Sequence, residues 1–240
     1  ESELTLLREG CLLRSIHFGK NSLRWIPEFT GWPGIKDNKK VTSAMLEILF
    51  RFSTESEKIE HLSIHGFSSV RNVDFLQHLP NLKSFSGTWC KGLTDIQGMS
   101  GHTMLEKVEL TGSSLLNLKP LADLQRLLYL YLGFSELTEK HCAVIKGLPK
   151  LVSLEIENLK NLSSLDYICH LPRLIFLNIH DCPNVQNVDG FCELPKLRSV
   201  KITRCAGLEN VNGLASCLAL KEVDLSVMGV WEPDYQQYMR

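Results

Sequence analysis

No apolar run in this 240-residue chain approaches the roughly 18 residues that a membrane-spanning helix needs. The formal net charge is only −1, so the chain lacks the basic excess of proteins that hold nucleic acid mainly through its phosphates. Direct nucleic-acid binding is therefore not expected, although this composition leaves room for a local basic patch.

Signature motifs of common enzyme classes are also missing. The sequence contains no G-x-x-x-x-G-K-[ST] phosphate loop, no G-x-G-x-x-G turn, no G-x-S-x-G elbow and no H-E-x-x-H pair. The eight histidines are scattered, and no thiolate or carboxylate joins His61 and His65 in their expected strand column. We therefore expect neither an enzyme, nor a cofactor, nor a bound metal.

Cysteine usage favours a reducing compartment. The chain has eight cysteines, without C-x-x-C spacing and without clustering at the two ends. In intracellular proteins, cysteines of this kind are typically reduced and buried, where they pack as small hydrophobic residues. We interpret Cys182 and Cys205, one repeat apart, as core packing rather than as a metal site. The prediction is an intracellular protein, cytoplasmic or organellar, and mitochondrial if a targeting segment has been removed before Glu1.

What the chain does contain is an internal repeat. The phrase apolar-x-x-apolar-x-apolar begins at residues 59, 82, 105, 127, 151, 174, 197 and 220, so consecutive copies lie 22 to 24 residues apart. The residue that opens each copy is counted here as position zero. An earlier copy begins at Leu13, two periods before Ile59, and the repeat between them is degenerate or replaced. Alternation within the phrase is typical of a half-buried strand, and the three-residue apolar spacing after it suits a short helical or 3₁₀ return.

The rest of the period supports the same interpretation. A Leu-Pro pair closes several units, and position eight is occupied by Cys90, Ser113, Ser135, Cys182 and Cys205. In residues 174–196, LIFLNIHDCPNVQNVDGFCELPK, the pattern resembles the leucine-rich-repeat family, and the resemblance covers about 13–33 and 59–227. It implies an α/β solenoid, a horseshoe or arc of about nine to ten repeats, with a parallel β-sheet on the concave face.

Three branches of that family share parts of this pattern. Cysteine at position eight and residues 90–96 resemble the repeats of ubiquitin-ligase substrate receptors, whose units are usually longer. The cysteine-containing 23-residue unit is also similar to kinetoplastid-type arrays, and plant immune receptors share the L-x-I-x-x-C phrase. The branch stays open at this point.

We predict a single domain over 1–240, with N-terminal repeats and irregular segments in 1–58, regular repeats in 59–227 and a C-terminal cap in 228–240. Within 1–58, the loop with Trp25 and Trp32 belongs either to a repeat with a longer convex helix or to a partner-docking insert. A helix is expected over 42–52, capped by Thr42 or Ser43, and another over 138–147. The apolar face expected for the first helix consists of Met45, Leu46, Ile48, Leu49 and Phe52.

The candidate binding surface follows from strand alternation. Positions three and five should point into the core, and positions two, four and six should point outward from the concave sheet. Exposed aromatic side chains are frequent binding hot spots, and acids beside them favour a basic partner segment. The alternative is that these rings only pack across neighbouring strands. The candidate partner-binding residues are Tyr129, Tyr131, Phe176, Trp89, Glu109, Glu155, His61, His65, Asn178 and His180.

These observations predict a non-catalytic scaffold or adaptor that binds a macromolecular partner through the concave sheet face. The partner is expected to be a protein, within a larger complex. One alternative is a structural subunit or assembly factor of a large ribonucleoprotein or organellar complex, which leaves an RNA-containing complex open. Another is a ubiquitin-ligase substrate receptor. These alternatives stay open because the fold alone does not determine function.

Overall fold

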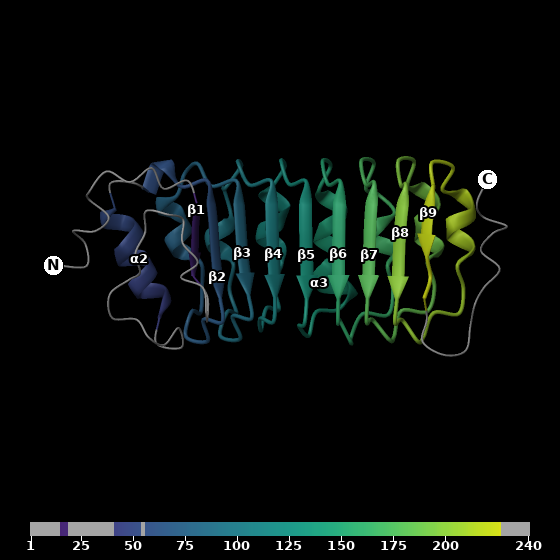
Figure 1. Ribbon diagram of the computed structural model, residues 1–240, viewed down its shortest axis with the longest axis horizontal. Coiled ribbons are helices and arrows are strands. Elements are labelled where there is room, and N and C mark those ends of the chain that lie inside the picture. The colour runs from purple at the N-terminus through teal and green to yellow at the C-terminus, as the bar shows by residue number, and fades with distance from the viewer. Residues whose placement is uncertain (1–14, 19–40, 54–55, 227–240) are drawn as a thin grey trace. The chain divides into compact units, whose positions relative to one another are not determined.

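Each copy of the repeat phrase forms one β-strand, followed by a turn and a short return behind the sheet (Figure 1). The structure is a computed structural model that describes residues 15–18, 41–53 and 56–226. Its contacts divide the chain into unit 1, residues 1–124, and unit 2, residues 125–240. The loop with Trp25 and Trp32 and the cap over 228–240 lie outside the described residues. A single domain over the whole chain stays a prediction.

The strands of each unit pair in parallel, in chain order. Paired Cα atoms lie one period apart, as in His61↔Ser84 and Ser153↔Phe176. The leucine-rich-repeat solenoid with a parallel sheet is therefore confirmed. In unit 1 the strands are β1 (Ser15–Phe18), β2 (His61–His65), β3 (Ser84–Thr88) and β4 (Lys107–Thr111). In unit 2 they are β5 (Tyr129–Gly133), β6 (Ser153–Glu157), β7 (Phe176–His180), β8 (Ser199–Thr203) and β9 (Glu222–Asp224).

The repeat expected between residues 13 and 59 is replaced rather than degenerate, because β1 pairs directly with β2. Helix α2 (Ser43–Phe52) lies in this interval. The oxygen Oγ1 of Thr42 accepts a hydrogen bond from the Met45 N–H at 3.3 Å, so the predicted N-cap is confirmed.

The predicted apolar face of α2 is wrong in part. Its buried residues are Leu46, Leu49 and Phe50, whereas Met45, Ile48 and Phe52 are exposed. Helix α2 packs against the return segment that follows β2, with the ring centroids of Phe50 and Phe75 5.9 Å apart. Only one i, i+3, i+4 stripe can face that neighbour, and the sequence did not identify the neighbour.

The returns are mostly 3₁₀ turns, as their three-residue apolar spacing predicts. The helix expected over 138–147 is shorter than predicted, because only α3 (Glu139–Cys142) is α-helical before the chain tightens into a 3₁₀ turn. Among the described residues, no helix has the length and apolar character to span a membrane. The 3₁₀ turns are Ser56–Lys58, Asp74–His78, Gln97–Met99, Lys119–Asp123, Ala143–Gly147, Asp166–Ile168, Asp189–Glu193 and Asn212–Ser216.

Position eight is buried in every described repeat, but its polar groups are satisfied unequally. The thiols of Cys90, Cys182 and Cys205 each lie 3.5 Å from the position-six carbonyl of their own repeat. By contrast, the hydroxyls of Ser113 and Ser135 are buried and have no hydrogen-bond partner. The cysteine ladder is thus a packing column in which a weak donor finds an acceptor and the shorter serine does not.

We expect Ser113→Ala to leave the free energy of unfolding unchanged or raise it by about 1 kcal/mol, because it removes an unsatisfied buried hydroxyl. The matched control is Ser56→Ala in the same unit. Ser56 is 6% exposed, against 7% for Ser113, but its hydroxyl donates to the Phe50 carbonyl at 2.6 Å. Urea unfolding should show a loss of about 1 kcal/mol for Ser56→Ala. An equal loss in both variants would contradict this account.

The close approach between the backbones of neighbouring repeats predicts that Gly213 and Gly147 differ in their tolerance of alanine. A Cβ on Gly213 would lie 1.9 Å from the Val188 carbonyl oxygen of the preceding repeat, whereas a Cβ on Gly147 would meet no atom within 4 Å. Gly213→Ala should therefore cost about 1–3 kcal/mol. Gly147→Ala should change stability by less than about 1 kcal/mol. Thermal or urea unfolding of the two variants measures this difference, and a tolerated Gly213→Ala would be inconsistent with the close packing of the returns.

Candidate partner-binding face

The outward strand columns follow the predicted alternation, although position six is buried in β4, β5 and β8. In β7, for example, Leu177 and Ile179 are buried, whereas Phe176, Asn178 and His180 are partly or largely exposed. We call the surface formed by positions two, four and six the open sheet face. Unit 1 presents His61, His65 and Glu109 there, with Trp89 directly after β3, and unit 2 presents the other six predicted residues. Their placement is confirmed, and their role in binding stays a prediction.

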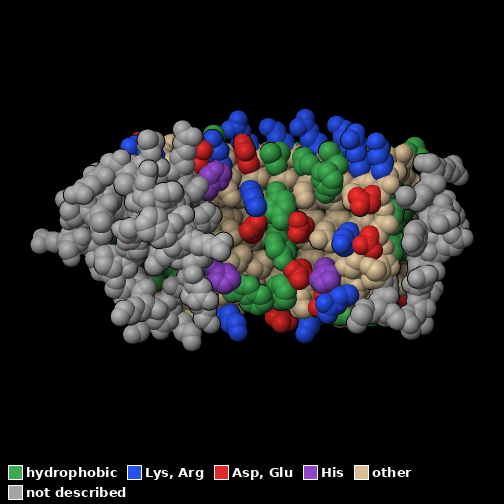
Figure 2. Space-filling view, viewed as in Figure 1, with side chains coloured by type: hydrophobic (Ala, Val, Ile, Leu, Met, Phe, Trp, Pro, Cys, Tyr) green, Lys and Arg blue, Asp and Glu red, His purple; other side chains and the backbone are tan. Residues whose placement is uncertain are grey.

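In unit 2 the open sheet face brings aromatic and acidic side chains together (Figure 2). Phe176 is 51% exposed. Tyr131 pairs in register with Glu155, and its hydroxyl donates to Glu157. Small Ser153 stands in the row between Tyr129 and Phe176. Tyr131 is therefore held in place by its neighbour, whereas the Phe176 ring projects into solvent.

This face of unit 2 carries four acids and one lysine in the three outward columns of β5 to β9. The lysine is neutralised, because Lys201 Nζ lies 3.5 Å from Asp224 Oδ2. Hydrogen bonds from Ser226 and the charge of Lys201 lower the pKa of Asp224, so this carboxylate stays ionised. The excess negative charge comes from Glu155, Glu157 and Glu222.

The residues at position four of the same face, here called the middle row, include hydrogen-bond acceptors that lack a donor. Among the described residues, no hydrogen bond or ion pair occupies the Glu155 carboxylate. Asn178 is its register partner on β7, and Asn178 Oδ1 is buried without a donor. A buried acceptor without a donor costs about 1–3 kcal/mol. The Glu155 carboxylate can therefore accept hydrogen bonds from an incoming group, and Asn178 Oδ1 can do so only if its side chain rotates.

In unit 1 the corresponding charges are already satisfied. Glu109 accepts a hydrogen bond from Ser86 Oγ at 2.7 Å, and its other oxygen lies 2.8 Å from Lys107 Nζ. Nδ1 of His65 lies 2.8 Å from Thr88 Oγ1, which repeats in unit 2 as His180 and Thr203 at 2.6 Å. The two histidines are thus partly structural, since each bridges neighbouring strands.

Position seven, directly after each strand, adopts a left-handed backbone that the sequence analysis missed. Its φ is positive at Gly66, Gly112, Asn158 and Asp181, which tolerate this conformation, but also at Trp89, Phe134 and Arg204. The signal was available as a column of Gly, Asn and Asp one residue before position eight. The position-seven N–H donates to the position-six carbonyl of the next repeat, as in Phe134 to Glu157 at 2.9 Å. Stacking of the repeats therefore imposes the conformation even where the residue disfavours it.

Trp89 shows what such a residue does. It is 41% exposed, yet a Cβ on Gly112 would lie only 2.7 Å from Trp89 Cε3. The indole ring thus covers the glycine backbone of the next repeat and still presents a large apolar surface. Trp89 combines a packing role with an exposed aromatic surface.

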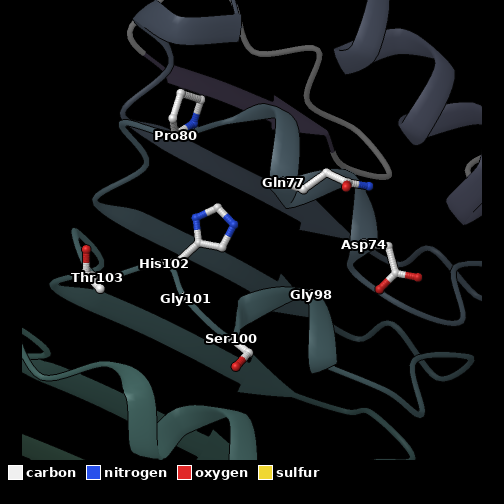
Figure 3. Close-up of a pocket in the computed structure, with 8 residues that line it drawn as sticks. All are labelled: Asp74, Gln77, Pro80, Gly98, Ser100, Gly101, His102 and Thr103. Carbon is white, nitrogen blue, oxygen red and sulfur yellow. The ribbon is translucent and has the colours of Figure 1, made fainter.

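The return side of unit 1 contains a pocket of about 540 Å³. Figure 3 shows the His102 ring between Pro80 and Gly101, with Asp74 towards one end and Thr103 towards the other. Burial lowers the pKa of His102, and its ring forms no hydrogen bond with another lining side chain. Ser100, which also lines the pocket, donates its hydroxyl to the carboxylate of Asp123.

The buried thiols of Cys90, Cys142 and Cys182 are held in the protonated form. Burial raises the pKa of Cys90 to about 11 and that of Cys142 to about 12. The neighbouring Cys205 thiol, together with burial, also raises the pKa of Cys182. Protonated thiols are poor nucleophiles and poor metal ligands. Among the described residues, no group of three or more histidine, cysteine or acidic side chains is arranged to hold a metal ion.

Solved structures similar to this chain are leucine-rich-repeat proteins. Internalin C2 from Listeria monocytogenes is 19% identical, with a TM-score of 0.55, over 78% of this chain and 85% of that one. The leucine-rich-repeat domain of the type III effector XopL is 19% identical, with a TM-score of 0.58, over 78% and 69%. TLR13, in the TLR13–ssRNA13 complex, is 16% identical, with a TM-score of 0.64, over 81% and 28%.

These likenesses show the fold, and the shared leucine-rich-repeat architecture agrees with the strand register described above. No family model matches the sequence, and no curated protein matches it either.

The left-handed backbone at position seven predicts that glycine is more stable than alanine there, which is the reverse of their order in a regular strand. At Phe134, the Gly variant should be more stable than the Ala variant by about 1 kcal/mol, because only glycine adopts positive φ without cost. The control is Phe176, an aromatic residue within a regular strand. There the Ala variant should be more stable than the Gly variant by about 0.5–1 kcal/mol. Urea unfolding of the four variants tests both orders, and the same order at both positions would refute the strain.

Proposed function

We propose that this protein is a non-catalytic scaffold or adaptor, which binds a basic segment of a partner protein on the open sheet face of unit 2. The observation that carries the proposal is the exposed Phe176 ring beside the unpaired Glu155 carboxylate. Rings that project into solvent are effective anchors, because they bury a large area at small entropic cost.

The chemistry of the middle row favours arginine or lysine in the partner. Glu155 offers an unpaired carboxylate, and Asn178 Oδ1 lacks a donor. A guanidinium group that entered between them could satisfy both after a small side-chain rotation, and it could also stack on the Tyr131 ring. Glu157 and Glu222 would extend the attraction along the strands.

Other parts of the sequence-based hypothesis belong to the same proposal. We assign the chain to the cysteine-containing 23-residue branch, treat 1–240 as one domain and place the protein inside the cell. The free thiols of Cys90, Cys142, Cys182 and Cys205 support a reducing compartment. A role in a larger complex fits a binding face without catalytic groups. The TLR13 complex contains single-stranded RNA, so nucleic acid is included below as a competing ligand.

The test is a selection of displayed random peptides on the full chain, followed by affinity measurements on the selected peptides. We expect enrichment of peptides that combine Lys or Arg with a large apolar residue. Phe176→Ala should weaken their binding about 30-fold, as expected for a hot spot near 2 kcal/mol. Glu155→Gln should weaken it about 5-fold and reduce its salt dependence.

The matched control is Leu218→Ala, since Leu218 is 91% exposed in the turn before β9 of the same unit. It should leave peptide binding within about 2-fold of the parent, a range below the about 1 kcal/mol that marks an interface contact. Peptides without basic residues, or equal losses in Phe176→Ala and Leu218→Ala, would argue against the proposal. If a single-stranded RNA binds more tightly than the selected peptides, and Phe176→Ala abolishes that binding, the partner is RNA and not a protein.

A further inference from the structure

A row of basic side chains follows the edge of unit 2 at which the strands begin. They occupy six of the ten positions directly before and after the residues that open its five repeats, and all six are exposed. Figure 2 shows Lys and Arg side chains along this edge. We call this row the basic edge, and its members are Arg126, Lys150, Arg173, Lys196, Arg198 and Lys221.

The backbone holds this row in regular register. In each repeat the carbonyl after the opening residue accepts two N–H groups from the next repeat, as when Ile175 O accepts from Arg198 at 2.9 Å and Ser199 at 3.1 Å. The opening leucines themselves are buried. Three members of the row also follow a Leu-Pro pair directly, at Lys150, Arg173 and Lys196. Parallel strands lie about 4.8 Å apart, so the basic edge repeats at that spacing.

Unit 1 provides a comparison within the same chain. At the equivalent positions of its described repeats, which open at residues 59, 82 and 105, it has Lys58, Glu60, Lys83 and Glu106, with two uncharged residues, so the charges cancel. One pair is in contact, because Lys83 Nζ lies 3.1 Å from Glu60 Oε1. In unit 2 the same two columns hold six bases and no acid. The asymmetry is therefore a property of unit 2 and not a general requirement of the repeat.

Most of these charges are not neutralised within the protein. Among the described residues, Lys150, Arg173, Lys196, Arg198 and Lys221 form no ion pair, whereas Lys201 and Arg204 on the same unit do. Like charges held in a row repel one another, and a ligand of opposite charge relieves that repulsion. The net charge of −1 for the whole chain conceals this local excess.

We infer that the basic edge binds an acidic α-helix of a partner protein, with about one carboxylate per helical turn facing the row. The pitch of an α-helix is about 5.4 Å, close to the repeat spacing of about 4.8 Å. Over the four intervals of the row the mismatch is only about 2–3 Å, which flexible Lys and Arg stems absorb. An extended strand places same-side residues about 6.7 Å apart and falls out of step by about 7–8 Å.

The charge around the row argues for a helix rather than nucleic acid. The open sheet face beside it carries Glu155, Glu157 and Glu222, which would repel a broad phosphate backbone. A helix that lies along the edge meets only the basic columns. The inference does not depend on the proposed function, since the two surfaces have opposite charge and different side chains.

The experiment uses the full chain and a capped peptide helix with glutamates at i, i+4 spacing along one face. A second peptide of the same composition, with its glutamates distributed around the helix, tests the geometry. We expect the one-faced helix to bind about 10-fold more tightly than its scrambled counterpart, as an advantage near 1.4 kcal/mol implies. Its affinity should fall steeply between about 0.05 M and about 0.5 M salt.

A matched pair of charge reversals locates the site. The double variant Lys150→Glu/Lys196→Glu should lose about 10-fold or more in affinity for the one-faced helix, since two ion pairs become two repulsions. The control Lys140→Glu/Lys160→Glu changes the net charge equally at exposed sites away from the basic edge and should stay within about 2-fold. Circular dichroism and urea unfolding verify that both variants are folded.

Two results would overturn the inference. Equal losses in the two double variants would show that only the net charge matters. A single-stranded oligonucleotide that binds more tightly than the one-faced helix, and loses affinity only in Lys150→Glu/Lys196→Glu, would assign the basic edge to nucleic acid instead.

Discussion

Hydrogen bonding between the backbones of successive repeats is the constraint on which the other features of this protein depend. Within each unit, the carbonyl at the start of a strand accepts two N–H groups from the next repeat, and the position-seven N–H at its end donates to the next repeat. These bonds hold neighbouring repeats about 4.8 Å apart with no slippage of register. Within a unit, each position of the repeat therefore forms a column of side chains, and the residues in a column determine the chemistry of that surface.

The core shows how much variation such a column accepts. Position eight holds Phe67, Cys90 and Ser113 in successive repeats of unit 1, and all three are buried. Burial is preserved because the backbone register does not depend on the side chain. Hydrogen bonding is not preserved, since the cysteine thiol finds the position-six carbonyl and the serine hydroxyl finds none. The stack tolerates these unsatisfied hydroxyls because the apolar contacts between neighbouring repeats offset their cost.

The surface columns differ between the two units in a way that points to function. In unit 1, Glu109 and Lys83 are matched by opposite charges or hydrogen-bonding neighbours. In unit 2, Glu155 on the open sheet face and Lys196 on the basic edge lack such partners among the described residues. Unit 2 therefore presents an acidic, aromatic face and a basic edge, each available to a ligand of complementary charge. Two surfaces of opposite sign on one rigid unit suit a protein that brings partners together.

The sequence alone determined the period, the strand positions and the side of the sheet on which each residue lies. Tyr131, Phe176 and Asn178 could be placed outward in advance, because alternation in a strand and a repeat of constant length are local properties of the chain. The N-cap of α2 was readable for the same reason.

The remaining features were decided by contacts between segments distant in sequence. The buried stripe of α2 depends on the return segment it meets, and so Phe50 replaced Phe52 in the core. The left-handed backbone at Trp89 and Phe134 follows from bonds to the next repeat, which override the preference of the residue. Pairing of Tyr131 with Glu157 and the lack of a partner for Glu155 are likewise tertiary, because which charges meet depends on the register of neighbouring repeats.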